Sequence, residues 1–315
     1  MMESFSIGSI ASGMGMHLWG LKSLGGFPAW AIECDPQIGE VYTENHPDSL
    51  MVCDRVENLS PDNLPDIDCL IATPSCKNAS LLRGSGLQET NSDLAVGNAI
   101  AKFIDAKRPK IFLLENVWQY RKFDSFRVIQ TALQNNEYGF AYYKINCSRL
   151  GVAQSRVRLY CIGIRFCQPP NEPNLPECSQ VSWHDALQDI LGTLPETILA
   201  PWQQKKFPEL PHTCLLKRVG GGRKSDRPYL PGEPSFTIRA LGRGCDRHWR
   251  QGDIKVGDKI HILTPRAALR LFGDAQTSDR IWLPTRNALA MECVGNGASW
   301  VVFQWLAQAA MNIVD

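Results

Sequence analysis

The chain has 315 residues, 44% of them hydrophobic and 21% charged, which allows a sizeable core in one large domain or two unequal ones. It shows neither a signal peptide nor an apolar run that could cross a bilayer, and its net charge is only +1, so we expect a cytoplasmic protein without a membrane partner. The eleven cysteines include no Cys-x-x-Cys pair and the six histidines are dispersed, which argues against a disulfide framework and a bound metal.

The first half of the chain alternates apolar strands with amphipathic helices. At Asp35-Pro36, an N-cap residue precedes proline at the first helical position, which predicts a helix start. The other expected elements are strands at 4–10, 29–33 and near Leu70, Leu113 and Ile162, and helices at 16–24, 125–135, from Thr264-Pro265 to Gly273, and at 300–313. This alternation predicts an α/β fold with a mostly parallel sheet and helices on both faces.

The amino-acid composition changes after Arg165, where proline-rich and glycine-rich sequence replaces the alternation of strands and helices. We therefore expect a smaller, loop-rich second domain. The expected divisions are a first domain at 1–180, the second domain at 181–284, and a segment at 285–315 that returns to the first domain.

A glycine loop, Ser12-Gly13-Met14-Gly15, follows the first strand and precedes a helix, so backbone amides there can approach a ligand. The third glycine of a dinucleotide fingerprint is absent, because Leu18 stands at that position. Glu33 ends the second strand, where a carboxylate can bind ribose hydroxyls. This combination favours a nucleoside cofactor without phosphates, such as S-adenosylmethionine, although a lone Gly-x-Gly more often marks an ordinary turn.

Three later segments bring reactive groups to predicted strand ends. Cys76 lies in a polar loop after an apolar strand, Glu115 ends another strand, and Arg156 and Arg158 precede a third. A nucleophilic cysteine needs a cationic or helix-terminal environment that lowers its pKa, and Lys77, Arg156 or Arg158 can supply it. Taken singly, each group has an ordinary explanation: a buried thiol, a structural carboxylate, and surface cations.

Together, these motifs resemble those of the cytosine-C5 DNA methyltransferases. That family has a Pro-Cys loop, a Glu-Asn-Val strand end and a Gln-x-Arg-x-Arg segment in this order, which correspond here to Pro74-Ser75-Cys76, Glu115-Asn116-Val117 and 154–158. The likeness continues through Leu263-Thr264-Pro265-Arg266 and Gly295-Asn296-Gly297 and covers nearly the whole chain. The resemblance implies a Rossmann-like methyltransferase domain, followed by a target-recognition domain at 181–284.

The resemblance also implies the reaction. Cys76 would attack C6 of a cytosine flipped out of double-stranded DNA, while Glu115 holds or protonates N3. Arg158 would contact the pyrimidine O2, and Arg156 and Asn116 would position the loop. The methyl donor would be S-adenosylmethionine.

The cofactor site that the resemblance implies starts at the glycine loop and ends near the last motif. Its residues are Ala11, Gly13, Met14, Gly15, Glu33, Cys34, Asp54, Pro74, Asn296 and Gly297. Glu33 corresponds to the family's ribose acid and Asp54 to the acid that contacts the adenine amino group. Ala11 stands where the family usually has a phenylalanine, and Ser75 and Lys77 also depart from the family pattern.

The charge distribution points to the surface that binds DNA. Residues 1–72 carry 11 acidic and 2 basic side chains, a net charge of −9, whereas residues 202–270 carry 15 basic and 6 acidic ones, a net charge of +9. A basic segment suits a polyanion, although a solvated surface without a partner explains the charge equally well. The expected DNA-binding residues are Lys77, Arg223, Lys224, Thr237, Arg239 and Arg243.

Two alternatives stay open beside a monomeric DNA methyltransferase of a restriction-modification system. One is an RNA (tRNA) cytosine-C5 methyltransferase, which the same fold supports. The large basic segment at 202–270 favours an enzyme that recognises duplex DNA instead. The other is a catalytically silent DNA-binding regulator, against which Cys76, Glu115 and Arg158 argue.

Overall fold

The computed structural model describes residues 4–75, 78–79, 88–218, 225–241 and 249–314. The chain forms two compact units. The first consists of Met1–Ile145, Val157–Leu175 and Val302–Asp315, and the second of Asn146–Arg156 and Pro176–Val301. The units therefore divide at other residues than the sequence suggested: the second also takes the short segment Asn146–Arg156 and extends to Val301. The catalytic and target-recognition roles of the two parts stay predictions.

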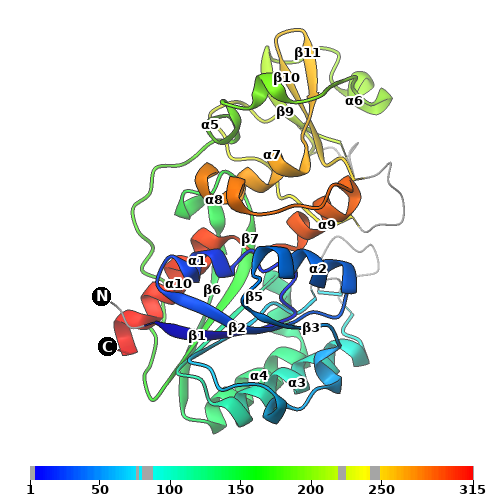
Figure 1. The fold of residues 1–315 in the computed structure, drawn as a ribbon. Helices are drawn as coiled ribbons and strands as arrows, with labels where there is room; N and C mark the ends of the chain where they lie inside the picture. The colour runs from blue at the N-terminus through cyan, green and yellow to red at the C-terminus, as the bar shows by residue number, and fades with distance from the viewer. Residues whose placement is uncertain (1–3, 76–77, 80–87, 219–224, 242–248, 315) are drawn as a thin grey trace. The chain divides into compact units, whose positions relative to one another are not determined.

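The first unit is built on a seven-stranded sheet with the order β3-β2-β1-β4-β5-β7-β6 (Figure 1). The strands β3, β2, β1, β4 and β5 are parallel, and β7 runs antiparallel to β5. The strand bounds are β1 Phe5–Ile10, β2 Gly26–Ile32, β3 Leu50–Val52, β4 Cys69–Ala72, β5 Ile111–Asn116, β6 Tyr138–Asn146 and β7 Val157–Arg165. The predicted α/β fold with a mostly parallel sheet is confirmed.

Helices cover both faces of this sheet. Figure 1 shows α3 and α4 below the sheet and α1, α2 and α10 above it. The bounds are α1 Leu18–Lys22, α2 Pro36–Asn45, α3 Asn91–Lys107, α4 Asp124–Asn135 and α10 Trp300–Val314. As predicted, the Asp35 carboxylate caps α2 by accepting from the backbone amides of Gln37 and Ile38. None of the helices in the described part of the chain is long and apolar enough to span a membrane.

The core of the first unit packs on both faces of the sheet. On the α3 side, buried Trp30 meets Phe103 with ring centroids 5.7 Å apart. On the α10 side, Phe303 packs edge-on against Tyr160 of β7 at 6.1 Å. Burial raises the pKa of the Cys161 thiol to about 12, as expected for a reduced core cysteine. Apolar packing thus holds the strands, while polar side chains gather at their ends.

The second unit contains a four-stranded sheet that the sequence did not predict. Its order is β8-β11-β10-β9, and all its neighbouring strands are antiparallel. The bounds are β8 Glu196–Thr197, β9 Thr213–Lys217, β10 Gly252–Val256, β11 Lys259–Ile262, α5 Trp183–Leu187, α6 Pro201–Lys206, α7 Pro265–Arg270, α8 Ala275–Arg280 and α9 Asn287–Asn296. Thr264 caps α7, as the Thr-Pro pair predicted.

Candidate active site

The glycine loop after β1 and the residue before it have left-handed backbone angles, which favour glycine. Gly13 and Gly15 have φ angles of +57° and +72°, and Ala11 has the uncommon positive value of +54°. A Cβ atom on Gly15 would lie 2.4 Å from the His46 ring, whereas one on Gly13 would meet no atom of the described residues within 4 Å. Gly15 therefore serves close packing, and Gly13 faces open space.

Two side chains that the sequence did not single out hold this loop. His46 Nε2 lies 3.0 Å from the Gly15 carbonyl oxygen, and Thr73 Oγ1 donates to the Ala11 carbonyl at 2.8 Å. Burial lowers the pKa of His46 to about 3, so its ring is neutral at pH 7 and donates from Nε2. Both residues lie far from the loop in sequence, so no local signal indicated them.

Two acids lie at the carboxyl ends of the neighbouring parallel strands. Buried Glu33, after β2, accepts from the Gly13 amide at 2.9 Å and from the Asp35 amide at 3.0 Å. Asp54, after β3, accepts from the Arg55 amide and the Asn58 side chain through Oδ1. The structure thus brings Gly13 and Glu33 into contact at one edge of the sheet, where open α/β sheets bind their ligands.

The other predicted cofactor residues have different surroundings. Met14 is buried. Cys34 is exposed as a residue. Partial burial of its thiol and the Glu33 carboxylate, 3.6 Å from the sulfur, raise the pKa of that thiol. Asn296 is exposed at the end of α9 and Gly297 follows it, both in the second unit.

The next strand end carries the acid predicted for catalysis. Glu115 lies on β5 opposite Tyr160 of β7, and its Oε1 is 3.1 Å from Nε of Arg158. Both side chains are largely buried, with exposed fractions of 8% for Glu115 and 13% for Arg158. Antiparallel pairing explains the contact, because Arg158 is the diagonal neighbour of Glu115 on the same face of the sheet. Carboxylate and guanidinium thus stand side by side in a site that excludes most water.

Asn116, beside Glu115, ties this strand end to the loop that leads to Cys76. Its side-chain amide donates to the Pro74 carbonyl at 2.9 Å, and its own oxygen accepts from the Val117 amide at 2.8 Å. Asn116 is buried, so the bonds are shielded from competing water. Cys76 and Lys77 lie outside the described residues.

Arg156 has quite different partners from Arg158, although only one residue separates them. Within the second unit its guanidinium donates to the carbonyls of Ile238 at 2.9 Å and Gly297 at 3.0 Å. It also lies 5.2 Å from the Phe272 ring centroid. Arg156 therefore joins three segments of the second unit, whereas Arg158 faces the predicted catalytic acid.

Of the predicted DNA-binding residues, the structure describes Thr237 and Arg239. Thr237 Oγ1 donates to the Ser155 carbonyl at 2.6 Å, and the Arg239 amide donates to Gln251 Oε1 at 3.4 Å. Gly295 is needed beside them, because a Cβ atom there would lie 2.2 Å from the backbone of Arg239 and Ala240. Arg223, Lys224 and Arg243 lie outside the described residues.

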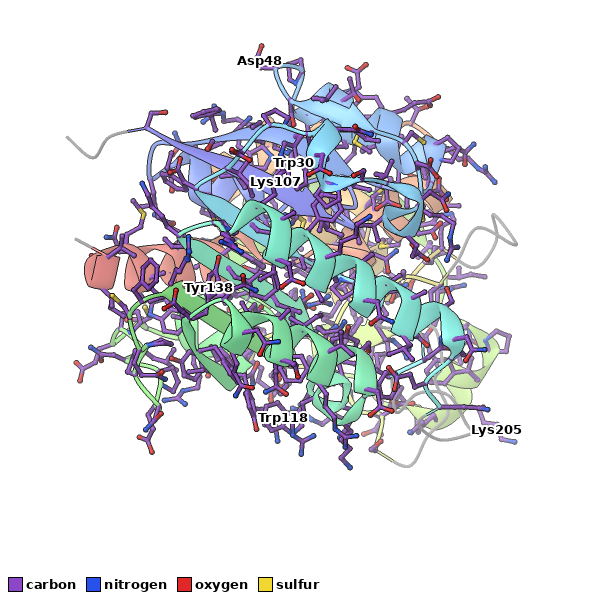
Figure 2. The ribbon with its side chains drawn as sticks, turned by 90° about the horizontal axis from the view of Figure 1, so that it is seen from below. Trp30, Asp48, Lys107, Trp118, Tyr138 and Lys205 are labelled. Carbon is purple, nitrogen blue, oxygen red and sulfur yellow. The ribbon has the colours of Figure 1, made fainter. Side chains whose placement is uncertain are left out.

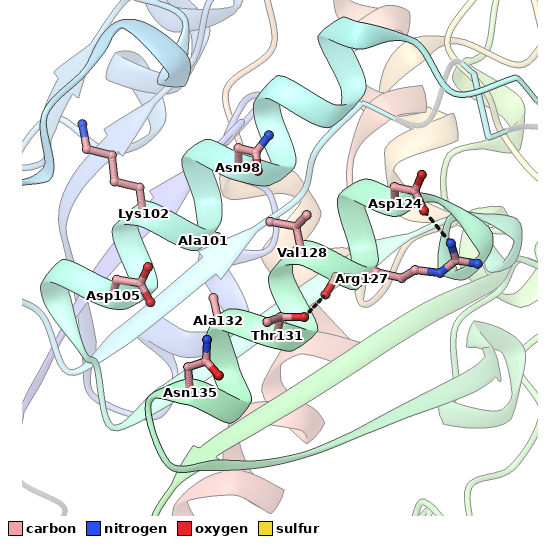
Figure 3. A pocket seen from close by; sticks show the side chains of 10 residues that line it. All are labelled: Asn98, Ala101, Lys102, Asp105, Asp124, Arg127, Val128, Thr131, Ala132 and Asn135. Atoms are coloured by element: carbon pink, nitrogen blue, oxygen red, sulfur yellow. Dashed lines mark hydrogen bonds and ion pairs between the residues drawn. The ribbon is translucent and has the colours of Figure 1, made fainter.

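One groove lies away from these strand ends. It runs between α3 and α4, has a volume of about 550 Å³, and is lined by Val128, Ala132 and polar side chains (Figure 3). The ion pair of Arg127 with Asp124 borders it. In the part of the chain that the structure describes, no group of histidine, cysteine or acidic side chains could hold a metal ion.

Comparison with known proteins decides the family. The model of the C-5 cytosine-specific DNA methylases matches residues 5–213. The chain belongs to this family. The family predicted from the motifs is thereby confirmed, and a methyl-donor cofactor is implied by the family.

Individual relatives extend this finding. The Type II methyltransferase M.NgoBI of Neisseria gonorrhoeae is 30% identical over 274 residues, which cover 83% of this chain and 80% of the relative. M.Bsp6I of Bacillus sp. (strain RFL6) is 29% identical over 178 residues, and the match covers 54% of this chain and only 55% of the relative's length. Among solved structures, the S. pombe Dnmt2 methyltransferase superimposes with a TM-score of 0.69 at 15% identity and covers 98% of this chain and 99% of the other, which shows the shared fold.

Proposed function

We propose that this chain transfers a methyl group from S-adenosylmethionine to C5 of a cytosine flipped out of a specific site in duplex DNA. The observation that carries the proposal is the buried pair of Glu115 and Arg158 at the carboxyl end of β5. Its neighbour Asn116 binds the carbonyl of Pro74, two residues before Cys76. Flipping is needed because the reacting carbons of a stacked base are out of reach.

The carboxyl ends of β1, β2 and β3 fit a nucleoside cofactor. The open space beside Gly13 lets a ligand approach the backbone closely, and Glu33 stands next to it. Each oxygen of a carboxylate can accept more than one hydrogen bond, so Glu33 retains capacity for ribose hydroxyls and Asp54 for the adenine amino group. S-adenosylmethionine, when bound, supplies an electrophilic methyl group.

The pair of Glu115 and Arg158 matches one edge of a pyrimidine. Cytosine presents O2 and N3 on adjacent ring atoms, and O2 is an acceptor for a guanidinium such as Arg158. The Glu115 carboxyl group is 3.1 Å from that guanidinium, so with O2 bound to Arg158 it lies within reach of N3 and can hold or protonate it. Because both side chains are largely buried, their interactions with a bound base would be stronger than in water.

Cys76 supplies the covalent step. C5 of cytosine is a weak nucleophile until the thiolate adds to C6 and forms a C6–S bond. The added electron pair makes C5 reactive while Glu115 holds or protonates N3. After C5 has accepted the methyl group, with S-adenosylhomocysteine as the leaving group, the C5 proton leaves and the C6–S bond breaks. This restores the ring double bond and the free thiolate, and any proton taken up at N3 returns to Glu115. Arg156 contributes at a distance, by holding segments of the second unit together.

The relatives' names suggest the biological setting. M.NgoBI and M.Bsp6I are named Type II methyltransferases, which supports a role for this chain in a restriction-modification system. In this proposal the chain acts as a cytoplasmic monomer, and the second unit recognises the DNA site. Lys77, Arg223, Lys224, Thr237, Arg239 and Arg243 would contact the DNA.

The test is transfer of a labelled methyl group from S-adenosylmethionine to genomic duplex DNA, with transfer RNA as the competing substrate. We expect label on DNA cytosine, and a loss of more than about a hundredfold in Cys76→Ser. Sequencing of the modified DNA then identifies the site.

Other outcomes decide between the alternatives. Transfer to DNA that survives in Cys76→Ser would refute the covalent mechanism. Label on transfer RNA alone would favour the RNA methyltransferase. Binding of DNA and S-adenosylmethionine without any transfer would favour a silent regulator.

A further inference from the structure

A cluster of cations and aromatic rings lies beside the candidate active site in the first unit. We call it the Trp118 cluster; it comprises Trp118, Arg121 and Lys122 of η3 (Trp118–Lys122), and Tyr142 and Lys144 of β6. Tyr142, Lys144 and Lys122 are exposed, and Trp118 and Arg121 are half-buried. In Figure 2, Trp30 lies among the helices and strands, whereas Trp118 lies at the outer edge.

The Trp118 ring brings two of these cations together. The Arg121 guanidinium stacks 4.2 Å from the ring centroid, and Lys144 Nζ lies 5.7 Å from it. Tyr142 lies beside the same ring, with centroids 6.3 Å apart. Contacts of this kind restrict long cationic side chains, so less conformational freedom is lost when a ligand binds them.

The cations of the cluster differ from other basic residues of the first unit in their charge balance. Within the described residues, no carboxylate forms an ion pair with Arg121, Lys122 or Lys144. By contrast, Lys107 pairs with Asp66 at 3.0 Å and Lys110 with Asp68 at 3.1 Å. Three positive charges without acidic partners at one surface favour an anion.

The position of the cluster indicates which anion. Trp118 follows Glu115 by three residues, so their Cα atoms lie within about 11 Å of each other. Each DNA strand carries one phosphate per about 3.4 Å of helix axis, so phosphates flank any base that the strand delivers to Glu115. Phosphate contacts orient a duplex without reading its sequence.

We propose that the Trp118 cluster binds the phosphate backbone of duplex DNA next to the flipped cytosine, with Arg121 and Lys144 as the main contacts. This inference rests on the proposed DNA methyltransferase function. It assigns part of the DNA affinity to the first unit, whereas the sequence alone pointed to the basic residues of 202–270. This contribution to DNA affinity does not depend on the DNA sequence, and it weakens as the salt concentration rises.

The test measures binding of a labelled duplex of mixed sequence to the full chain over roughly 50–200 mM salt. We expect Arg121→Gln and Lys144→Gln each to reduce the slope of log K against log salt by about 0.9, because each removes about one phosphate contact. At 0.1 M salt this corresponds to a loss in affinity of about eightfold. Arg121→Lys, which keeps the charge, should retain most of the slope.

Lys110→Gln is the matched control. It removes the same charge from an exposed lysine of the same unit, but at the amino end of β5 and from an ion pair with Asp68. Its slope should equal that of the wild type. Unchanged thermal unfolding and binding of S-adenosylmethionine would show that each variant is folded.

The outcomes separate this inference from the proposed function. If the wild type methylates DNA but neither cluster variant changes the slope, or Lys110→Gln changes it equally, the inference is wrong and the proposed function stands. If the variants lose affinity for transfer RNA but not for the duplex, the surface serves RNA instead. A wild type that neither binds nor methylates DNA would overturn both.

Discussion

Two buried carboxylates, one in each unit, show how the same chemical group serves different purposes. Asp253, in β10, is fully buried, and each of its oxygens accepts from one guanidinium: Arg218 at 2.9 Å and Arg250 at 2.8 Å. Glu115, at the end of β5, forms an ion pair with the Arg158 guanidinium. A carboxylate with both oxygens bound inside a sheet stabilises the fold, whereas one at a strand end stands where a ligand can reach it.

One partner of Asp253 lies in the basic segment 202–270. The Arg250 guanidinium donates to Asp253 and to the Thr197 hydroxyl, each at 2.8 Å. Arg218 directly precedes the segment 219–224, which carries Arg223 and Lys224, and Arg250 follows the segment 242–248, which carries Arg243, by two residues. Asp253 thus fixes the chain next to both segments.

The largest effect is expected at Glu115. Glu115→Gln keeps the size of the side chain but removes the charge that pairs with Arg158, so it should lower methyl transfer to duplex DNA by about 10²–10⁴-fold. The measurement is single-turnover transfer, with chemical denaturation as the check on folding. If transfer fell by less than tenfold, Glu115 would have a structural role like that of Asp253.

The next largest effect is expected at Asp253, where stability should fall and methyl transfer should not. Asp253→Asn leaves two guanidiniums without a negative partner in a buried place, so it should lower the free energy of unfolding by about 3–5 kcal/mol. Transfer per folded molecule should stay close to that of the wild type on a saturating substrate. A stable Asp253→Asn that has lost transfer would mean that the contrast between the two carboxylates is wrong.

The smallest effects concern the glycine loop. Gly13→Ala introduces a positive φ strain of about 1–2 kcal/mol and places a methyl group in the open space beside the loop, so it should weaken binding of S-adenosylmethionine. Gly15→Ala adds a contact of 2.4 Å with His46 to the same strain, so it should destabilise the fold more than Gly13→Ala does. Calorimetric titration with S-adenosylmethionine and denaturant unfolding measure the two quantities. Equal losses of stability would contradict the different roles of the two glycines.

Local patterns were sufficient for much of the first unit and for the start of one helix in the second. The start of α2 at Asp35-Pro36 and of α7 at Thr264-Pro265 followed from capping chemistry, which acts over three or four residues. The helix α3 was missed although its signal was present, since Thr90 and Asp93 form a capping box. The sheet of the second unit was missed because its strands have two to five residues and lie in proline-rich and glycine-rich sequence.

The order of motifs along the chain determined the family and the fold class and predicted the set of reactive residues, because residue types and spacings are local properties. Only the tertiary structure decided which of two nearby arginines pairs with Glu115. Arg158 reaches it because β7 runs antiparallel to β5, while Arg156 precedes the strand and binds carbonyls of the second unit. The same holds for His46 below Gly15 and for the cations around Trp118, since contacts between distant segments depend on how strands and helices pack and not on any local pattern.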